Sequence, residues 1–518
     1  MRPTPEAAIF DLDGVVTFTA RIHAEAWKRL FDEFLRSRAE AAGEPFRPFT
    51  DTDYRAHVDG RPRSDGVRTF LASRGITLPE GAPSDPPDAE TVVGLGRRKD
   101  LIFRDLLAER GVEVDTDAVR LIRELRERGV RVGVASSSKN TALILEKAGL
   151  ADLFDARVDG IVSEELGLRG KPAPDIFLVC LQRLGVCDAQ RAVVVEDAIA
   201  GVEAGRAGGF GLVLGVDRGG HGIALREHGA DWVVRDLREL SADRIEAWFA
   251  HRGDARPNAI AHWAEIAAEL HGRRPALFLD YDGTLTPIVE HPDLATLGDD
   301  MRDTLRRVAA AWPTTVISGR DRENVMRFVG LEDINYAGSH GFDISGPAAG
   351  GVRLEVAREA APVITAVADE LRRRTAGIPG VLVEHKKYAV SVHYRMVDEA
   401  RVPDIERIVD DVLAQRPELR KGTGKKVFEL RPAIEWDKGR AVLWLLETLG
   451  LDRPDVVPLY IGDDATDEDA FRALAKRGIG ILVAEIPRPT AARYGLQDVR
   501  EVRELLERLA ALREESGR

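Results

Sequence analysis

Two aspartates separated by one residue open a short motif that occurs twice in the chain. Asp11 and Asp13 stand in IFDLDG, and Asp280 and Asp282 stand in LFLDYDG. In both places the motif directly follows a short apolar run, so the two carboxylates leave the end of a predicted buried strand. At this spacing one carboxylate can attack phosphorus while the other moves a proton. The motif therefore predicts covalent catalysis by an aspartate at two separate sites.

Three further polar elements follow each aspartate pair in the same order, each at the end of a predicted strand. They are a serine, a lysine and an acidic pair: Ser136, Lys171 and Glu196-Asp197 in the first half, and Ser318, Lys438 and Asp463-Asp464 in the second. A lone Asp-x-Asp-Gly is a weak signal, because Asp-Gly is a common turn pair. Four elements in one order, found twice in a chain, form a far more specific pattern.

These residue types suit the transfer of a phosphoryl group, which depends on positioning and charge compensation. A carboxylate is a weak nucleophile toward a phosphate dianion because both are negative, so the site needs Mg²⁺, a hard cation that binds carboxylate oxygens. Ser318 and Lys438 would bind the remaining phosphoryl oxygens. The expected ligands in the second half are Asp280, the backbone carbonyl of Asp282, and Asp463, with Asp464 and Asp467 holding the waters of the ion.

The elements that must position these residues have the pattern of parallel sheets. Short apolar runs such as AAIF, AVVV, PALFL and VPLYI end in the polar residues of the motifs and are followed by helical periodicity. Such runs indicate parallel strands covered on both faces, with functional groups at their carboxyl ends. The predicted fold class is therefore α/β, with two doubly wound, Rossmann-like cores.

The motif spacing differs between the halves. Asp11 and Ser136 are 125 residues apart, whereas Asp280 and Ser318 are only 38 apart. A core with fixed strands cannot absorb such differences, so each half must carry an insertion at a different point. The first insertion reads as helical, and the second contains β-rich stretches and reads as a small α/β lid.

A short polar stretch at 250–257 separates two helical patterns and marks the expected domain boundary. The resulting layout is a first domain at 1–250 with a helical lid at about 20–100, and a second domain at 258–518 with an α/β lid at about 340–432.

Composition excludes several kinds of partner. The formal net charge is −13 and no long basic run offsets it, which argues against nucleic-acid and anionic membrane surfaces. No stretch approaches 18 uninterrupted apolar residues, and the first residues have no signal-peptide core. Cys180 and Cys187 lie about 10 Å apart on a predicted helix, too far for a disulfide. We expect a cytoplasmic protein with small-molecule partners, and the oligomeric state is left open.

Both halves resemble the haloacid dehalogenase superfamily of phosphatases and mutases. The second half, about 258–512, resembles trehalose-6-phosphate phosphatases through LFLDYDGTLTPI, VISGR, YAGSHG, VEHKKYAVSVHYR, GKKVFELRP, WDKG and IGDDATDEDAF. The resemblance implies that Asp280 is the nucleophile and Asp282 the acid/base. It also implies a set of mainly charged residues around a disaccharide: Arg320, His340, Glu384, Lys386, Arg395, Lys425, Glu429 and Arg431.

The first half, about 5–240, resembles β-phosphoglucomutase and its phosphatase relatives through IFDLDGVVTFTARIHAEAWKRLF, DGRPR, ASSSKN, GKPAPDIF and VEDAIAGVEAG. The resemblance implies a parallel catalytic and metal set: Asp11 as nucleophile, Asp13 as acid/base, with Ser136, Lys171, Glu196 and Asp197. It places His23, Trp27 and Arg63 where a lid closes over the sugar phosphate, although His23 could equally be a buried core histidine. Asp59 stands where the mutases have a lysine, and an acidic group there would repel a substrate phosphate.

We therefore expect a Mg²⁺-dependent enzyme whose C-terminal half hydrolyses trehalose 6-phosphate through an aspartyl phosphate. Its N-terminal half would act on a hexose phosphate, as a phosphatase or as a mutase. One alternative is a general sugar-phosphate phosphatase in both halves, which would not need the charged residues between Glu384 and Arg431. Another is a non-catalytic scaffold or sensor in one half, which would be supported by a lost nucleophile or lysine; neither half shows such a loss.

Overall fold

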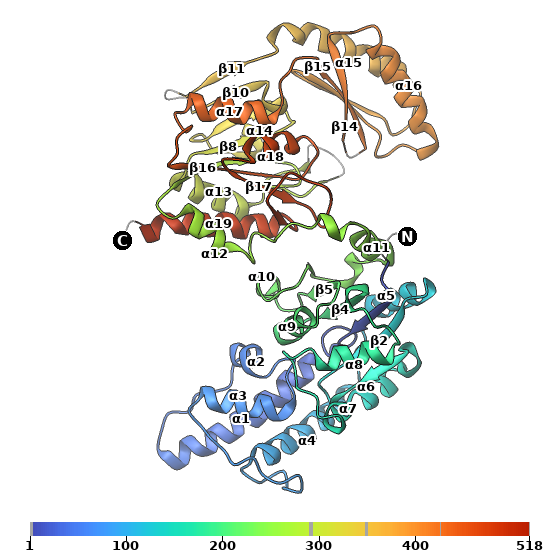
Figure 1. Cartoon of the computed structure of the whole chain (residues 1–518), viewed down its shortest axis with the longest axis vertical. Helices are drawn as coiled ribbons and strands as arrows, with labels where there is room; N and C mark the ends of the chain where they lie inside the picture. Colours follow the sequence, from blue (N-terminus) through green and yellow to red (C-terminus); the bar gives the residue numbers. More distant parts are fainter. Residues whose placement is uncertain (1–3, 290–293, 348–350, 425, 517–518) are drawn as a thin grey trace. The chain divides into compact units, whose positions relative to one another are not determined.

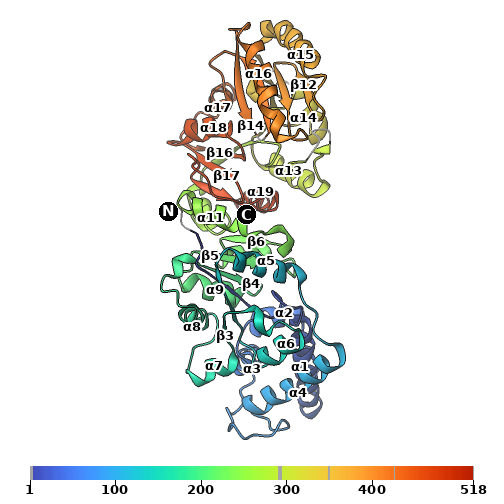
Figure 2. The same cartoon turned by 90° about the vertical axis from the view of Figure 1, so that its right-hand side faces the viewer.

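The computed structural model describes residues 4–289, 294–347, 351–424 and 426–516, and it divides into two compact units, Met1–Gly253 and Asp254–Arg518. Figure 1 and Figure 2 show both units with their sheets and helices. Each unit has a core sheet and a lid inserted into it, and the units are described in turn.

The core of the first unit is a six-stranded parallel sheet. Its strands, in the order β3-β2-β1-β4-β5-β6, are Ala156–Val158, Arg131–Ala135, Ala7–Phe10, Ala192–Glu196, Leu212–Val216 and Trp232–Val234. Alternate residues of β1 enter different apolar clusters: Ala8 and Phe10 pack on one face, Ala7 and Ile9 on the other. Because neither face meets water, the strands read as continuous apolar runs.

Helices cover both faces of this sheet. One face packs against α5 (Thr116–Glu127), α6 (Thr141–Lys147) and α11 (Ala242–His251). The other packs against α8 (Asp175–Arg183), α9 (Ile199–Ala207) and α10 (Gly222–Glu227), and α7 (Gly160–Glu165) follows β3. The predicted doubly wound α/β class is confirmed for this unit.

Four helices inserted between β1 and β2 form the lid of the first unit. They are α1 (Ala20–Ala42), α2 (Asp51–His57), α3 (Arg63–Ser73) and α4 (Val92–Arg110). The helices lie together in both views, coloured blue, and they enclose an apolar cluster of their own that includes Trp27, Phe31 and Phe70. The insertion is helical, as the sequence predicted, and it runs on to residue 110.

The core of the second unit is an eight-stranded sheet. Its strands, in the order β11-β10-β9-β8-β7-β16-β17-β18, are Arg353–Glu355, Asp343–Ser345, Asn335–Gly338, Thr314–Ile317, Arg274–Leu279, Val456–Gly462, Ile479–Val483 and Tyr494–Leu496. The strands from β9 to β18 are parallel, and β10 and β11 add an antiparallel edge. Helices of this core are α12 (Trp263–Leu270), α13 (Asp299–Ala311), α14 (Arg322–Val329), α17 (Lys438–Thr448), α18 (Asp467–Leu474) and α19 (Val499–Ser516).

The lid of the second unit is a four-stranded antiparallel sheet backed by two helices. The strands, in the order β12-β13-β15-β14, are Leu382–Lys386, Ala389–His393, Val427–Pro432 and Leu419–Gly424, and the helices are α15 (Ala361–Thr375) and α16 (Val402–Leu413). The estimate that this lid begins at about residue 340 was wrong. The strands β10 and β11 continue the core sheet by pairing with β9, so the lid follows them.

Two composition-based expectations can be compared with the fold. Cys180 is buried, Cys187 is exposed, and both are free. The predicted helix through both cysteines was too long, because α8 ends at Arg183 and Cys187 lies beyond it. Within the described residues, no helix has both the length and the apolar character needed to cross a bilayer.

Candidate active sites in the two units

Lys438 is the centre of the buried polar network of the second unit. Lys438 opens α17, where the Asp437 side chain caps the helix by accepting from the Arg440 amide. Nζ of Lys438 lies 2.7 Å from Oδ1 of Asp280 and 2.6 Å from Oδ1 of Asp467, and all three side chains are buried. Burial alone would lower the pKa of Lys438, but the two carboxylates raise it, so this lysine stays charged.

Three carboxylates of the second unit converge near the end of β7. Oxygens of Asp280, Asp463 and Asp467 all lie within 4.8 Å of one another. Burial, with the charges of Asp467 and Asp463, raises the pKa of Asp280 well above its usual range despite the opposing charge of Lys438. Crowded, buried carboxylates of this kind are stabilised by a divalent cation, and oxygen is the ligand that Mg²⁺ and Ca²⁺ prefer. The cluster therefore fits a hard metal ion.

Asp464 differs from the other predicted metal residues. Its Oδ1 accepts from the amide and hydroxyl of Thr466, both at 2.7 Å, so the side chain closes the turn before α18. Burial would raise the pKa of Asp464, but the charge of Lys438 and the Thr466 hydroxyl lower it. Asp467 in turn accepts from the Asp464 amide at 2.9 Å. Asp464 therefore supports the cluster through the turn.

The second aspartate of the pair is held by an arginine. Arg320 donates from Nε and Nη2 to the two carboxylate oxygens of Asp282, each at 2.6 Å. The Arg320 amide also donates to Oγ of Ser318 at 3.1 Å. Ser318 is buried at the end of β8, where the sequence predicted the phosphate-binding serine.

One face of the lid sheet carries the predicted sugar-binding charges. The register pairs Glu384 with Ser391 and Ser391 with Glu429, and Lys386 and Arg431 lie two residues from Glu384 and Glu429 along their strands. Because side chains alternate between the faces of a strand, these five residues share a face. The opposite face, which includes Val390 and Leu430, packs with α15 and α16.

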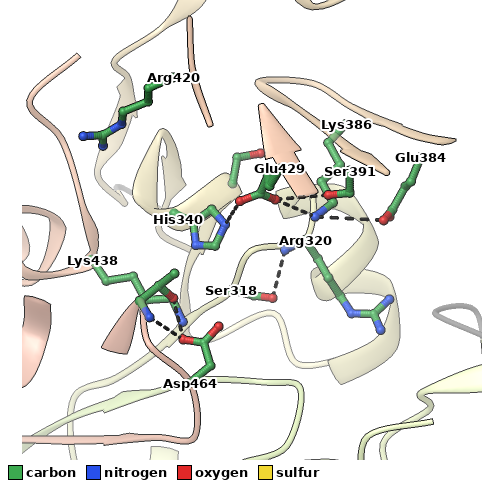
Figure 3. Close-up of polar contacts among 12 residues, drawn as sticks. Ser318, Arg320, His340, Glu384, Lys386, Ser391, Arg420, Glu429, Lys438 and Asp464 are labelled. Atoms are coloured by element: carbon green, nitrogen blue, oxygen red, sulfur yellow. Dashed lines mark hydrogen bonds and ion pairs between the residues drawn. The ribbon is translucent and has the colours of Figure 1, made fainter. Parts of the chain in front are cut away.

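His340 joins this polar face to the core. Its backbone lies in the left-handed region at φ 58°, and its amide donates to the carbonyl of Ser318 at 2.9 Å. Its Nε2 lies 2.8 Å from Oε2 of Glu429, whose Oε1 accepts from Lys386 at 3.1 Å. Figure 3 shows His340 between Lys438 and Asp464 of the core and Glu429 of the lid.

The remaining predicted lid residues are less directly connected to this cluster. Arg395 donates to the Val289 carbonyl at 2.8 Å, which joins the lid to the loop after the aspartate pair. Arg431 lies opposite Arg420 on the neighbouring strand, and Arg420 points away from the cluster in Figure 3. Lys425 lies outside the described residues.

Lys171 of the first unit also lies between two buried carboxylates. Nζ of Lys171 lies 2.6 Å from Oδ1 of Asp11 and also contacts Oε1 of Glu196. The other Glu196 oxygen accepts from the amides of Asp197 and Ala198, each at 2.9 Å. Burial raises the pKa of Asp11 to about 8 against the charge of Lys171, and that of Asp197 is also raised well above its usual range. Cation binding would relieve this crowding as well.

His23 lies beside the aspartate pair of the first unit. Its Nε2 lies 3.4 Å from Oδ1 of Asp13, and its Nδ1 lies 2.5 Å from Nζ of Lys99. Asp13 also accepts from the hydroxyls of Thr19 at 2.5 Å and Ser136 at 3.2 Å. Burial, with the Lys99 charge, lowers the pKa of His23. His23 thus contacts both the first site and the apolar core, because its ring also stacks on Phe103 with the ring centres 4.0 Å apart.

The first site opens into a cavity of about 390 Å³ between the core and the helical lid. Trp27 and Arg63 line it as predicted; Arg63 is ion-paired to Asp100 at 2.6 Å. Asp59 also lines it. Burial, with the charge of Glu196, raises the pKa of Asp59 to about 6, against the hydrogen bond from the Tyr54 side chain. The charge of Asp59 in turn helps to raise the pKa of Asp197, so Asp59 repels the predicted metal carboxylates.

Sequence reasoning missed two buried residues. The Tyr460 hydroxyl donates to Oδ1 of Asp467 at 2.7 Å, and Lys99 contacts His23 with its ammonium over the Trp27 ring. Tyr460 lies in the apolar run of β16, and Lys99 lies mid-helix in α4, outside any motif. The one available signal was a polar group among apolar neighbours: the Tyr460 hydroxyl in an apolar strand, and the Lys99 ammonium on the apolar face of a helix.

Two doubly wound cores with the same four polar elements at their strand ends define haloacid dehalogenase-type hydrolase domains. A family model for haloacid dehalogenase-like hydrolases matches residues 5–209, and one for trehalose-phosphatases matches residues 278–500. A probable trehalose-phosphate phosphatase 4 of Oryza sativa subsp. japonica is 46% identical over 290 residues, which cover 55% of this chain and 78% of that protein. The chain belongs to the trehalose-phosphatase family through its second unit.

Two further relatives extend the comparison. An uncharacterized glycosyl hydrolase of Mycobacterium tuberculosis is 40% identical over 511 residues, covering 98% of this chain and 38% of that protein. The chain thus spans well under half the length of this relative. A solved β-phosphoglucomutase of Clostridium difficile is 25% identical, with 48% of this chain and 97% of that one covered and a TM-score of 0.39.

Proposed function

We propose that the second unit hydrolyses trehalose 6-phosphate to trehalose and phosphate, with Mg²⁺ as cofactor. The observation that carries this proposal is the polar lid face, where Glu384, Lys386 and Glu429 interlock with His340 beside the catalytic core. Sugar hydroxyls are selected by charged hydrogen-bond partners, because each unmet partner is costly once buried. Family membership and the named relatives support the same substrate.

In this mechanism an Asp280 oxygen attacks phosphorus, and the bond from phosphorus to the sugar oxygen breaks. Asp282 gives its proton to that oxygen, so trehalose leaves as a neutral alcohol. Asp282 then takes a proton from water, the water oxygen attacks the aspartyl phosphate, and phosphate leaves as the Asp280 carboxylate re-forms. Lys438 compensates charge on Asp280 throughout, and Ser318 orients a phosphoryl oxygen.

Asp280, Asp463 and Asp467, with the Asp282 carbonyl, would hold the ion, and Asp464 would support them through its turn. Bound there, Mg²⁺ would neutralise charge on the phosphoryl oxygens and on the attacking carboxylate.

The test is phosphate release by the full chain from a panel that contains trehalose 6-phosphate, glucose 6-phosphate and sucrose 6-phosphate. We expect kcat/KM for trehalose 6-phosphate to exceed the others by about 100-fold, since the site would be built for both rings. Equal rates across the panel would favour the general sugar phosphatase instead.

We also propose that the first unit hydrolyses a small phosphomonoester such as a hexose phosphate, with Asp11, Asp13, Ser136 and Lys171 in the same roles. A mutase must hold a second phosphate, and three cations at the cavity are already paired with carboxylates: Lys139 with Glu164, Arg63 with Asp100, and Arg169 with Asp175. Arg61 and Lys99 also line the cavity. His23, Trp27 and the lid would then enclose the neutral body of the substrate.

The assay for the first unit uses the full chain with Asp280→Asn, so that the second site is silent. It supplies β-glucose 1-phosphate with a trace of β-glucose 1,6-bisphosphate and follows glucose 6-phosphate and free phosphate. Free phosphate as the main product supports hydrolysis. Rapid glucose 6-phosphate with little free phosphate would establish the mutase.

We propose in addition a cytoplasmic location and small-molecule partners. Two free cysteines suit a reducing compartment, and a net charge of −13 disfavours nucleic acid and anionic lipid.

A further inference from the structure

Both oxygens of the Asp282 carboxylate are occupied by a single guanidinium. The two Arg320 contacts are each 2.6 Å long, which is the parallel, bidentate arrangement that makes an arginine–carboxylate pair strong. This pairing fixes the orientation of the Asp282 carboxylate and uses one acceptor site on each oxygen, so it competes with a bond to the leaving oxygen of a substrate. Release from Arg320 would therefore free Asp282 to act as acid or base.

Arg320 is itself firmly placed. Its side chain is 9% exposed, and its guanidinium lies 5.6 Å from the Tyr281 ring centre and 5.2 Å from that of Phe328. Nη1 donates to Asn324 at 3.2 Å. Asp282 is the less enclosed partner, because its side chain is 39% exposed on the turn after β7.

The first unit shows that the fold does not require this pairing. Ser138 occupies the turn position of Arg320, since its amide donates to Oγ of Ser136 at 3.1 Å as the Arg320 amide does to Ser318. Asp13, the counterpart of Asp282, instead accepts hydrogen bonds from the hydroxyls of Thr19 and Ser136. An arginine at this turn is therefore a feature of the second unit and calls for an explanation of its own.

A competing carboxylate for Arg320 comes from the lid. Glu384 lies near Arg320 in Figure 3, on the polar face of the lid sheet, and the attraction between the two groups helps to lower the pKa of Glu384 after the contributions of His393 and Lys386. The lid is also tied to the core beside this point, where the Lys387 amide donates to Asp321, the residue after Arg320, at 2.7 Å. Movement of the lid thus acts directly on the Arg320 turn.

We propose that Arg320 is a positioning residue that restrains Asp282 and exchanges it for Glu384 when the lid closes on a disaccharide phosphate. The inference rests on the proposed hydrolysis and adds a coupling between substrate size and acid/base action. A phosphate ester too small to engage the lid leaves Arg320 on Asp282 and is hydrolysed slowly. The arginine thereby protects the site from wasteful turnover of small esters.

The experiment measures kcat/KM for trehalose 6-phosphate and for glycerol 1-phosphate, using the full chain with Asp11→Asn in every variant so that the first site is silent. For Arg320→Gln we expect about threefold faster hydrolysis of glycerol 1-phosphate and about tenfold slower hydrolysis of trehalose 6-phosphate. Arg320→Lys keeps the charge but loses the planar guanidinium that donates to both oxygens. Its ratio of the two kcat/KM values should therefore lie between the ratio for Arg320→Gln and that for the parent.

Two controls separate positioning from general damage. Arg327→Gln removes an exposed arginine that lies over the same Phe328 ring, and it should leave both rates within about twofold. Adding Asp282→Asn to Arg320→Gln should abolish the gain on glycerol 1-phosphate, because the gain is exerted through Asp282.

A fall by the same factor on both substrates in Arg320→Gln and Arg320→Lys would overturn the inference, as would a gain that survives Asp282→Asn. If the parent released no phosphate from trehalose 6-phosphate, the proposed function would fail instead.

Discussion

In each unit a lysine joins the first aspartate of the pair to a second carboxylate, but the second carboxylate comes from a different part of the motif. In the first unit it is Glu196, the last residue of β4, and in the second it is Asp467, the first residue of α18. A Cβ on Gly201 would lie 1.8 Å from Oε1 of Glu196, and one on Gly462 would lie 2.3 Å from Cγ of Asp467. A carboxylate at one position thus requires a glycine at the other.

This exchange corrects the alignment of the two acidic pairs. Gly14 faces Asp197 closely, and Gly283 faces Asp463 in the same way, so Asp197 corresponds to Asp463. Glu196 then takes the place of Asp467, and Asp464 has the turn-closing role described above. The two units therefore place a carboxylate beside the lysine from different positions of the motif, because the chemistry depends on where the carboxylate lies and not on which residue supplies it.

The first prediction separates the two sites and has the largest effect. Asp280→Asn should lower phosphate release from trehalose 6-phosphate by about a thousandfold or more, because it removes the nucleophile. Asp11→Asn is the matched change in the first unit and should leave this rate within about twofold. Steady-state phosphate assays on the full chain decide it. Loss of activity in Asp11→Asn would reverse the assignment of the units.

The second prediction concerns the metal. Exhaustive chelation should abolish trehalose 6-phosphate hydrolysis, Mg²⁺ should restore it, and Ca²⁺ should inhibit, because its larger and looser shell lets the nucleophilic carboxylate bind both oxygens to metal. Calorimetric titration of Mg²⁺ into the chelated chain should lose its second-unit binding in Asp463→Asn. Full activity without metal would contradict the proposed chemistry.

A third prediction tests the lid as the region that most distinguishes the units. Glu384→Ala, Lys386→Ala and Arg395→Ala should each lower kcat/KM for trehalose 6-phosphate by about 10–100-fold but that for 4-nitrophenyl phosphate by less than about threefold. The reason is that a small aryl phosphate never used the lid. Arg374→Ala, on the outer helix α15, serves as the control. Matching losses on both substrates would show that the three residues support the fold.

The fourth prediction examines the hydroxyl that the first unit lacks. Glu196 accepts hydrogen bonds from two backbone amides, whereas Asp467 accepts one from a backbone amide and one from the Tyr460 hydroxyl. Tyr460→Phe removes one donor from a buried carboxylate, which costs about 1–3 kcal/mol. We expect lower stability of the second unit in denaturant melts and weaker Mg²⁺ binding by titration calorimetry. Unchanged values in both measurements would mean that Lys438 and the Asp464 amide are enough to hold Asp467.

The last and smallest effect is a pH dependence in the first unit. Burial, with the charge of Arg63, lowers the pKa of Lys99 from 10.5 to about 7. The unfolded chain therefore binds more protons between these values, so Lys99 costs stability below about pH 7 and the cost fades as pH rises toward 10.5. Lys99→Met should stabilise the first unit by about 1–3 kcal/mol at pH 6 and by little at pH 10. Scanning calorimetry at both pH values measures it, and an equal shift at both would refute it.

The sequence by itself determined the fold class and identified the candidate catalytic residues. Short continuous apolar runs that end in polar residues and alternate with helical patterns are typical of strands buried on both faces, so the doubly wound cores and the positions of Asp11, Asp280 and Ser318 at the strand ends followed from them. The helical insertion was equally readable, because its periodicity is local. These features depend on neighbours in the chain.

Only the tertiary structure decided the partners. The exchange of Glu196 for Asp467, the grip of Arg320 on Asp282 and the contact of Lys99 with His23 join residues that are far apart in sequence and lie outside any shared spacing. The lid boundary was misjudged because short strands near residue 340 pair with whichever sheet edge is adjacent in space. Side-chain reach and strand pairing depend on three-dimensional distance, which residue order alone does not specify.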